Sequence, residues 1–281
     1  VFTTNPTYAI NIIAKSLKLE AGDEILSTNH EYGALDRTWK YYCDKAGAKY
    51  VQQEIPIPLR SKEQFIENFW KGYSENTKAI FISHITSMTA LIFPVKEICD
   101  RAKELGLITI VDGAHVPGHI PLNLLELKAD IYTGACHKWL LTPKGNSFLF
   151  VNKEFQNDFD PVIISWGYEA DVPGKSKFLD YHQQQGTRDY SAFLTIPAAL
   201  KFRTDNNWDQ VSLDSKRLIL ENYKDLCSIV GSSPICPVTS EFLGQICSIP
   251  VPVNDPLDLK NILFDKYKIE IPVFKLREHV F

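Results

Sequence analysis

The sequence predicts an α/β fold with a largely parallel sheet, and three observations lead to this prediction. Helical and strand-like segments alternate through residue 151, which is the pattern of repeated strand–helix–strand units. The segment LITIVDGAH (107–115) is a run of Ile and Val that ends abruptly in polar residues, as expected of a strand covered on both faces. Apolar residues make up 44% of the chain and charged residues 23%, the balance of an ordinary globular protein.

Caps, chain breakers and the spacing of apolar residues place the elements of the first half. Asn5 and Pro6 are an N-cap and a first-turn proline for an amphipathic helix, which Gly22 ends. A second helix, at 32–47, closes on Gly47. The same signals predict strands at 24–28, 48–54, 78–84, 107–115, 130–138 and 148–151, and helices at 61–73 and 95–106.

The second half of the chain has a different pattern, in which the regular alternation of helix and strand is lost. Strand-like runs around a helix near its end predict a small α/β domain. The expected segments are a loop-like stretch at 155–187, helices at 191–202 and 208–230, turns at 232–240, strand-like runs at 244–251 and 268–274, and a helix at 256–267.

The length of 281 residues allows one large domain and a smaller one. We place the boundary near Asn206, so that residues 1–205 form the large domain and residues 206–281 the small one. The chain starts at Val1 and its only methionine is Met88. We therefore expect that an N-terminal segment was removed or that the chain is a fragment.

Composition and charge argue against several classes of partner. The net charge is −4 and no Lys/Arg cluster is present, which predicts binding to neither nucleic acid nor an anionic membrane. No apolar run approaches the roughly 20 residues that span a bilayer. The six cysteines are scattered and form no C-x-x-C pair, which favours a reducing compartment and hence the cytoplasm.

Two polar residues follow predicted strands and carry the functional argument. Asp112 ends the most apolar strand and Lys138 follows a later one, and ligands of open α/β sheets bind beyond the carboxyl ends of strands. Taken singly, Asp112 also fits a turn or N-cap aspartate and Lys138 a surface lysine. Together they are the two groups that pyridoxal 5'-phosphate (PLP) needs: a lysine to form a Schiff base with the aldehyde, and an acid to keep the pyridine nitrogen protonated.

Two motifs make the resemblance to a known family specific. The segments DGAHVPGHIPL (112–122) and DIYTGACHKWLLTPKG (130–145) resemble the isopenicillin N epimerase-like branch of the class V aminotransferases, a group that includes cysteine desulfurases, C–S lyases and epimerases. The resemblance extends from the first residues to about Phe274. It implies the fold of PLP-dependent transferases of fold type I, with a PLP-binding large domain and a small C-terminal domain. It also implies that segments at both ends of the family's chain are missing here.

The resemblance assigns roles to four residues around the cofactor ring. Lys138 would hold the cofactor and later move protons at the substrate α-carbon, and Asp112 would pair with the pyridinium nitrogen. His115 would lie near the phenolic oxygen of the cofactor. The segment NHEYGA (29–34) matches the stretch whose histidine stacks on the pyridine ring, which gives His30 that role. A strand-end histidine that caps the next helix is the structural alternative for His30.

The phosphate group would lie at the start of the first predicted helix, because a helix N-terminus supplies hydrogen-bond donors and a positive field. The loop TTNPT (3–7) matches the family's phosphate loop, although N-capping alone would also explain Asn5. The segment GTRD (186–189) resembles the stretch that, in family dimers, reaches the phosphate of the neighbouring subunit. Arg188 fits either a substrate carboxylate or a structural ion pair. The cofactor contacts implied here are Thr4, Asn5, Thr7, Thr86, Thr133, His137 and Thr187.

The resemblance implies a homodimeric PLP enzyme that acts at the α-carbon of a small-molecule amino acid. Epimerisation, β-elimination by a C–S lyase and transamination remain open, and each would begin when Lys138 removes the α-proton. Persulfide-forming desulfuration is disfavoured. The segment 268–281, which matches the family's loop with a nucleophilic cysteine, contains none.

Two other classes of function also remain open. Asp112, His115 and His119 give the spacing D-x-x-H-x-x-x-H, which would suit a metal-binding hydrolase. Pro117 and Gly118 lie between the histidines and would interrupt the helix that such a site needs. If the missing segments are truly absent, the protein would be a PLP-binding pseudo-enzyme. A dinucleotide enzyme is not supported, because no G-x-G-x-x-G follows a strand.

Overall fold

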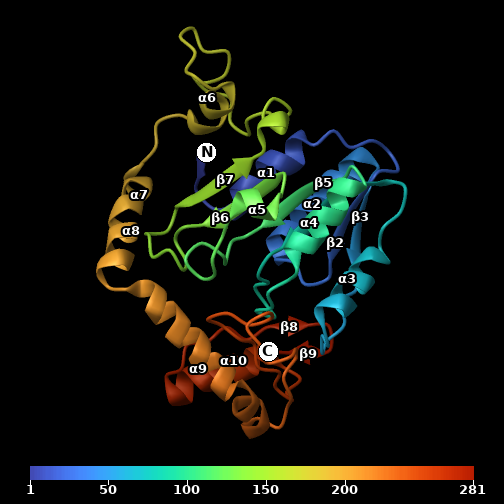
Figure 1. Cartoon of the computed structure of the whole chain (residues 1–281), viewed down its shortest axis with the longest axis vertical. Helices are drawn as coiled ribbons and strands as arrows, with labels where there is room; N and C mark the ends of the chain where they lie inside the picture. The colour runs from blue at the N-terminus through green and yellow to red at the C-terminus, as the bar shows by residue number, and fades with distance from the viewer.

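The computed structural model describes residues 1–281 and has a seven-stranded sheet in the first half of the chain (Figure 1). Along the order β1-β7-β6-β5-β4-β2-β3, strands β6 to β3 are parallel, whereas β7 pairs antiparallel with both β6 and β1. The predicted mainly parallel α/β fold is confirmed. The strands are β1 (Phe2–Thr3), β2 (Glu24–Thr28), β3 (Lys49–Gln53), β4 (Thr77–Ser83), β5 (Ile108–Asp112), β6 (Ile131–Ala135) and β7 (Ser147–Val151).

Helices cover both faces of this sheet. Residues of α1 and α2 pack in one apolar cluster with one face, and residues of α3 and α4 pack in a second cluster on the other. The caps follow the sequence: the Asn5 side chain accepts a hydrogen bond from the backbone N–H of Tyr8, and Gly47 ends α2 in a left-handed conformation. The helices are α1 (Pro6–Ser16), α2 (Gly33–Ala46), α3 (Lys62–Trp70), α4 (Val95–Glu104) and the short α5 (Leu124–Leu127).

The central strands divide their side chains between the two clusters. In β4, Ile80 and Ile82 belong to the cluster under α3 and α4, whereas Ala79 and Phe81 belong to the cluster under α1 and α2. Successive side chains of a strand point to opposite faces, so a strand covered on both sides must be apolar throughout. This is why the sequence shows unbroken Ile and Val runs here.

The register of the parallel strands brings their carboxyl ends together. Ser83 at the end of β4 is the partner of Asp112 at the end of β5, and Asp112 is in turn the partner of Thr133 in β6. The chain leaves β2 for the edge strand β3 and then returns to β4 on the other side of β2. A crevice is expected where successive connections diverge in this way.

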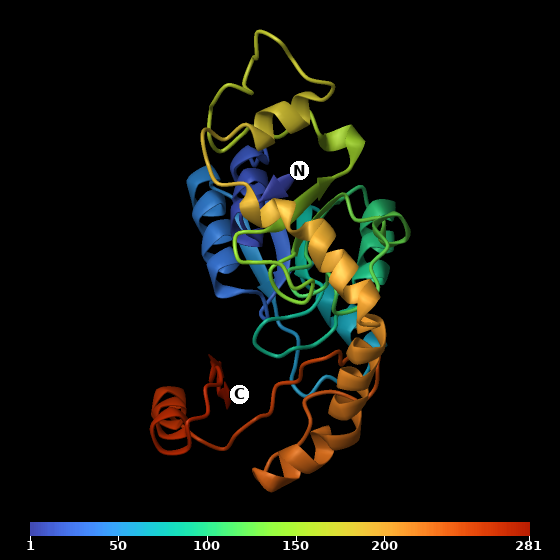
Figure 2. The same ribbon diagram turned by 90° about the vertical axis from the view of Figure 1, so that its left-hand side faces the viewer.

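The second half of the chain extends away from the sheet in two directions. A segment with α6 projects beyond β7, and the long α9 runs from the body of the molecule to the C-terminal segment (Figures 1 and 2). The stretch at 155–187 was expected to be loop-like, but it contains the helix α6. The elements are η1 (Lys153–Phe155), α6 (Lys177–Gln183), α7 (Ser191–Leu194), α8 (Ile196–Asp205), α9 (Trp208–Ile229), α10 (Pro256–Tyr267), β8 (Lys275–Leu276) and β9 (His279–Val280).

The strands of the C-terminal segment do not form at the runs expected from the sequence. The run at 244–251 makes only an isolated bridge, Val251 with Val280, and the run at 268–274 is not a strand. Both runs contain proline, which cannot donate to a ladder. The segment instead packs on the sheet body, since Tyr223, Phe242 and Phe281 join the cluster under α3 and α4.

The proposed division into domains at 1–205 and 206–281 stays a prediction. The break between α8 and α9 lies close to it, at Asn206 and Asn207. None of the helices is both long and apolar enough to cross a membrane.

Candidate active site

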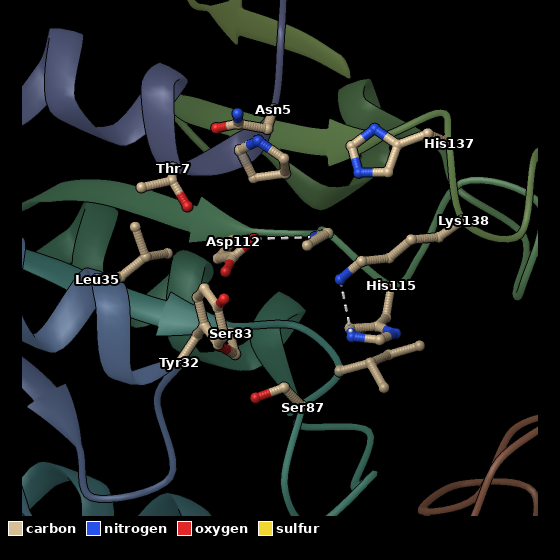
Figure 3. Close-up of a pocket in the computed structure, with 13 residues that line it drawn as sticks. Asn5, Thr7, Tyr32, Leu35, Ser83, Ser87, Asp112, His115, His137 and Lys138 are labelled. Carbon is tan, nitrogen blue, oxygen red and sulfur yellow. Dashed lines mark hydrogen bonds between the residues drawn. The ribbon is translucent and has the colours of Figure 1, made fainter. Parts of the chain in front are cut away.

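A cavity of about 420 Å³ opens at the carboxyl ends of the parallel strands (Figure 3). Its walls come from the segments that follow β2, β4, β5 and β6, and from the first turn of α1. This is the position at which the strand order predicts a crevice. The cavity contains one carboxylate, one amine and two imidazoles, from Asp112, Lys138, His115 and His137.

Asp112 is the last residue of β5 and is only 4% exposed. Its Oδ1 accepts a hydrogen bond from the backbone N–H of Ala114 at 2.9 Å, and the chain provides no other partner. Burial raises the pKa of Asp112, while the Ala114 N–H and the charge of Lys138 oppose that rise. Gly113 allows the turn, because a Cβ there would lie 2.0 Å from the phenolic oxygen of Tyr132. Asp112 therefore has an unused acceptor in the cavity.

Lys138 reaches the cavity from the turn that follows β6. The carbonyl oxygen of Asn146 fixes this turn by accepting from the N–H groups of Cys136 and His137, at 3.0 and 3.2 Å. The amine nitrogen of Lys138 lies 3.0 Å from Nε2 of His115. Lys138 is an exposed residue overall, but desolvation by the surrounding protein lowers the pKa of its amine against the opposing charge of Asp112.

His115 lies between Lys138 and the indole of Trp139. The Trp139 N–H donates to Nδ1 of His115 at 3.3 Å. Burial and the neighbouring charge of Lys138 lower the pKa of His115 to about 3. His115 is therefore a neutral imidazole in contact with an amine whose own pKa is lowered.

The other end of the cavity suits an anion. Asn5 and Thr7 line it at the N-terminus of α1, where the helix dipole favours negative charge. His137 also lines it, and its Nδ1 donates to the carbonyl oxygen of Asn146 at 2.7 Å, which leaves Nε2 free to contact a ligand. In Figure 3 these three side chains lie on one side of the cavity, above Asp112.

Three threonines expected at the cofactor do not line the cavity. Thr133 points across the sheet and donates to the carbonyl oxygen of Phe148 at 2.8 Å. Thr86 is fully buried in a turn, where its hydroxyl bonds to that of Thr89 and accepts from the N–H of Leu91. Thr4 is half-buried outside the cavity. The expected cofactor contacts of Thr4, Thr86 and Thr133 therefore have no support from the lining of this cavity and stay predictions.

His30 is also placed elsewhere. It is fully buried, its Nδ1 lies 3.0 Å from the hydroxyl of Thr89, and its Nε2 lies 2.9 Å from the carbonyl oxygen of Ile55. Because Nε2 must donate to a carbonyl, Nδ1 accepts from Thr89. His30 thus ties the strand end to two loops. It does not cap the next helix, because the N-cap of α2 is Tyr32 and no side chain bonds there, and its role at the cofactor stays a prediction.

Three residues not predicted from the sequence line the cavity near these positions. Tyr32, two residues after His30, lines the cavity with 48% of its surface exposed. Ser83 and Ser87 line it on either side of Thr86. A strand-end segment was recognised in each case, but its sequence did not indicate which side chain turns toward the cavity.

The segment GTRD lies away from the cavity of its own chain. Thr187 is exposed, and neither it nor Arg188 lines the cavity. The Arg188 guanidinium lies over the rings of Tyr190 and Phe193, each at 5.1 Å, and donates to Gln185. Arg188 makes contacts with aromatic rings and an amide but no ion pair within this chain, and its expected roles stay predictions.

The three residues considered as metal ligands are engaged separately. His115 contacts Lys138 and Trp139, whereas Nε2 of His119 accepts from the backbone N–H of Gln245 at 2.6 Å. Asp112, His115 and His119 do not come together as a group that could hold an ion, and no such group of three occurs in residues 1–281.

The sequence pattern that describes the family Aminotransferase class-V matches residues 1–273. The chain is 30% identical over 285 residues to isopenicillin N epimerase from Amycolatopsis lactamdurans, covering 97% of this chain and 72% of that protein. It is 26% identical over 276 residues to a probable chloroplastic L-cysteine desulfhydrase from Arabidopsis thaliana, covering 92% and 56%.

The fold is similar to that of a cystine C–S lyase solved as a variant with glycine covalently linked to its PLP cofactor. The TM-score is 0.77 at 17% sequence identity, and the match covers 100% of this chain and 74% of that one. This likeness agrees with the predicted fold type I architecture, which is confirmed.

The position of His30 predicts a loss of stability when it is replaced. Burial lowers the pKa of His30 to about 4, so between that pH and about 6.5 the unfolded chain binds a proton that the folded chain does not. Its contribution to stability is complete above about pH 6.5 and is lost as the pH falls toward 4. We expect His30→Gln to lower the free energy of unfolding at neutral pH by about 1–3 kcal/mol and to flatten this decline in urea titrations.

His279 provides the control, because it lies in the short hairpin at the C-terminus and is more exposed. His279→Gln should leave the titrations unchanged. If His30→Gln kept full stability but lost PLP, His30 would belong to the cofactor site after all.

Proposed function

The chain belongs to the aminotransferase class V family of PLP-dependent enzymes, and we propose that it acts at the α-carbon of an amino acid, with Lys138 holding the cofactor. One observation carries the assignment of the residues. Lys138 and Asp112 come from two neighbouring parallel strands and line the same cavity. These are the two groups that PLP requires.

The groups lining the cavity fit PLP. Asp112 has a carboxylate oxygen without a partner in the chain, which suits a protonated ring nitrogen. Asn5, Thr7, His137 and the N-terminus of α1 would hold the phosphate at the other end. Tyr32 also lines the cavity and would supply an aromatic side chain for the ring.

The proposed chemistry follows from what these residues do to protons and charge. When bound, PLP supplies an aldehyde for covalent attachment and a ring that withdraws electrons from the α-carbon. The amine of Lys138 acts as the base that removes the α-proton, since its lowered pKa leaves more of it neutral than an ordinary lysine. Asp112 would keep the ring nitrogen protonated and positive, and the stabilisation that this positive charge gives the α-carbon grows as negative charge develops there.

Epimerisation, C–S β-elimination and transamination all begin with this proton transfer. The relatives include an epimerase and a cysteine desulfhydrase, which supports an enzyme over a PLP-binding pseudo-enzyme. Persulfide chemistry has no support within this chain, because none of its six cysteines lines the cavity. Cys136, which lies nearest Lys138 in sequence, is buried, and burial raises the pKa of its thiol to about 11.

We also propose that the enzyme is a cytoplasmic homodimer. All six cysteines are free thiols, which fits a reducing compartment. Large apolar side chains project into solvent from residues 160–205, including Trp166 at 87%, Val172 at 88% and Leu194 at 77% exposure. Patches of this kind mark interaction surfaces, and GTRD lies in the same stretch, so a second copy is the occupant that the resemblance favours.

Replacing Lys138 should abolish covalent retention of the cofactor. We expect borohydride reduction followed by peptide mapping to find PLP on Lys138 in the natural chain and no PLP-modified peptide in Lys138→Ala. Lys144→Ala removes an exposed lysine from the next loop and should change nothing. A PLP adduct at another lysine in Lys138→Ala would overturn the assignment.

Asp112→Asn should retain part of the PLP but lose most activity. The reaction type need not be known, because exchange of the substrate α-proton with D2O reports the first step, for whichever amino acid changes the spectrum of the bound cofactor. We expect exchange to slow by about a hundredfold, the typical effect of losing one electrostatic contact to developing charge. Asp130→Asn changes a carboxylate at the opposite end of the sheet, bonded to Thr109. Equal rates in the two variants would remove Asp112 from its role.

Leu194→Asp should weaken the proposed dimer. A charge placed in an apolar interface is costly to bury, so the dimer dissociation constant from analytical ultracentrifugation should rise at least about tenfold, equivalent to about 1.4 kcal/mol. Leu125→Asp introduces the same charge at an equally exposed position on α5, where the side chain is 84% exposed. The dimer proposal fails if the natural chain sediments as a monomer or if both variants behave alike.

A further inference from the structure

A row of three side chains, Trp139, His115 and Lys138, links the wall of the cavity to its amine. The Trp139 N–H donates to Nδ1 of His115 at 3.3 Å, and Nε2 of His115 lies 3.0 Å from Nζ of Lys138. Trp139 itself does not line the cavity. It touches the reacting groups only through His115.

The donors and acceptors in this row permit only one arrangement of protons. An indole N–H can only donate, so Nδ1 of His115 must carry a lone pair. A neutral imidazole then has its proton on Nε2. The Nε2–H group faces the Lys138 nitrogen, which can accept it only as a neutral amine, since an ammonium group has donors and no acceptor.

The alternative arrangement produces a conflict. If Lys138 were an ammonium that donated to Nε2, the imidazole would carry its proton on Nδ1. That N–H would face the N–H of Trp139, and two donors would oppose each other. Protonating His115 at both nitrogens brings the same conflict and adds a positive charge beside Lys138.

We propose that Trp139 is a positioning residue that holds His115 in its Nε2–H tautomer and so keeps Lys138 as a neutral, reactive amine. The inference rests on the proposed role of Lys138 as the cofactor lysine. The Trp139–His115 contact itself does not depend on that role.

The indole is held firmly enough to act in this way. Its ring packs on His119 with centroids 4.2 Å apart, and the carbonyl oxygen of Trp139 accepts from Arg203 at 3.2 Å. The backbone of Gly118 presses against the same carbonyl, since a Cβ at Gly118 would lie 2.4 Å from that oxygen. The indole thus has one ring contact, and the backbone carbonyl of Trp139 is held by two further contacts.

Charged and titratable neighbours also act on the equilibrium between the neutral and ammonium forms of Lys138. Asp112 acts on Lys138 and favours the ammonium form. Lys138 and His119 act on His115 and disfavour its imidazolium form. His119 accepts from the N–H of Gln245 through Nε2, and burial lowers the pKa of His119 to about 4. Asp112 and the Trp139–His115 pair therefore act on Lys138 in opposite directions.

Two measurements on the full chain freed of PLP test the inference. Nitrogen-15 NMR of the histidine rings reports the tautomer of His115 in the natural protein. The pH dependence of PLP capture, quenched with borohydride and quantified on the Lys138 peptide, reports the neutral amine. Capture requires the amine lone pair, because the lysine nitrogen forms a C=N bond with the aldehyde carbon and the aldehyde oxygen leaves as water.

Trp139→Phe keeps an aromatic ring against His119 and removes only the donor. We expect its His115 to shift toward the Nδ1–H tautomer and its capture midpoint to rise by about one pH unit, which makes capture about tenfold slower at any pH below the midpoint. Trp70→Phe is the matched control, because the Trp70 indole N–H is buried and has no acceptor. Its capture profile should match that of the natural chain.

Each outcome bears on a separate claim. An Nδ1–H tautomer of His115 in the natural chain overturns the inference, whether or not Trp139→Phe folds. An unchanged midpoint in a folded Trp139→Phe also overturns it. If PLP is captured at a different lysine while His115 keeps the Nε2–H tautomer, the assignment of Lys138 fails and the role of Trp139 in fixing the tautomer stands.

Discussion

The candidate site depends on one costly feature, a carboxylate buried at the end of a central strand with a single hydrogen bond from the chain. Burying an unpaired carboxylate is unfavourable, and burial raises the pKa of Asp112 accordingly. The fold supplies the conditions that hold it there. Apolar clusters cover both faces of β5, and Gly113 lets the chain turn over Tyr132. A cationic ring nitrogen would satisfy the free oxygen, so the cofactor completes what the chain leaves open.

Burial shifts the pKa values of Asp112 and Lys138 in opposite directions, because it disfavours the charged form of each group. Desolvation lowers the pKa of Lys138, and the charge of Asp112 opposes this without forming a direct pair with the amine. The amine instead contacts His115, a neutral imidazole. In the proposed site the two groups have separate roles, Asp112 toward the ring nitrogen and Lys138 toward the reacting carbon. This division of roles resembles other sites in which neighbouring groups drive two pKa values in different directions.

The sequence could predict the strand ends but not the orientation of each side chain beyond them. Unbroken Ile and Val runs indicated β4 and β5, and the structure brings Asp112 and Lys138, from the motifs around them, to the same cavity. His30 and Thr86 do not line that cavity, for a common physical reason. Both lie in turns after a strand, where the period of two ends, and both turn inward to bond with Thr89. Their neighbours Tyr32 and Ser87 face the cavity instead.

The C-terminal half could be predicted least because its packing is not local. The two strand-like runs there each contain a proline and form no strand. Apolar residues of the run at 244–251 pack against the sheet body, whereas Ile269, Ile271 and Phe274 of the run at 268–274 stay exposed. The second sheet consists of β8 and β9 alone. The stretch at 160–205 also has apolar side chains that its own chain leaves in solvent. Hydrophobic surface of this kind is stable only when something covers it. The segment GTRD lies in this same stretch and does not line the cavity of its own chain. A second copy that covers the exposed apolar side chains would also complete the cofactor site, which would explain why the two features occur together.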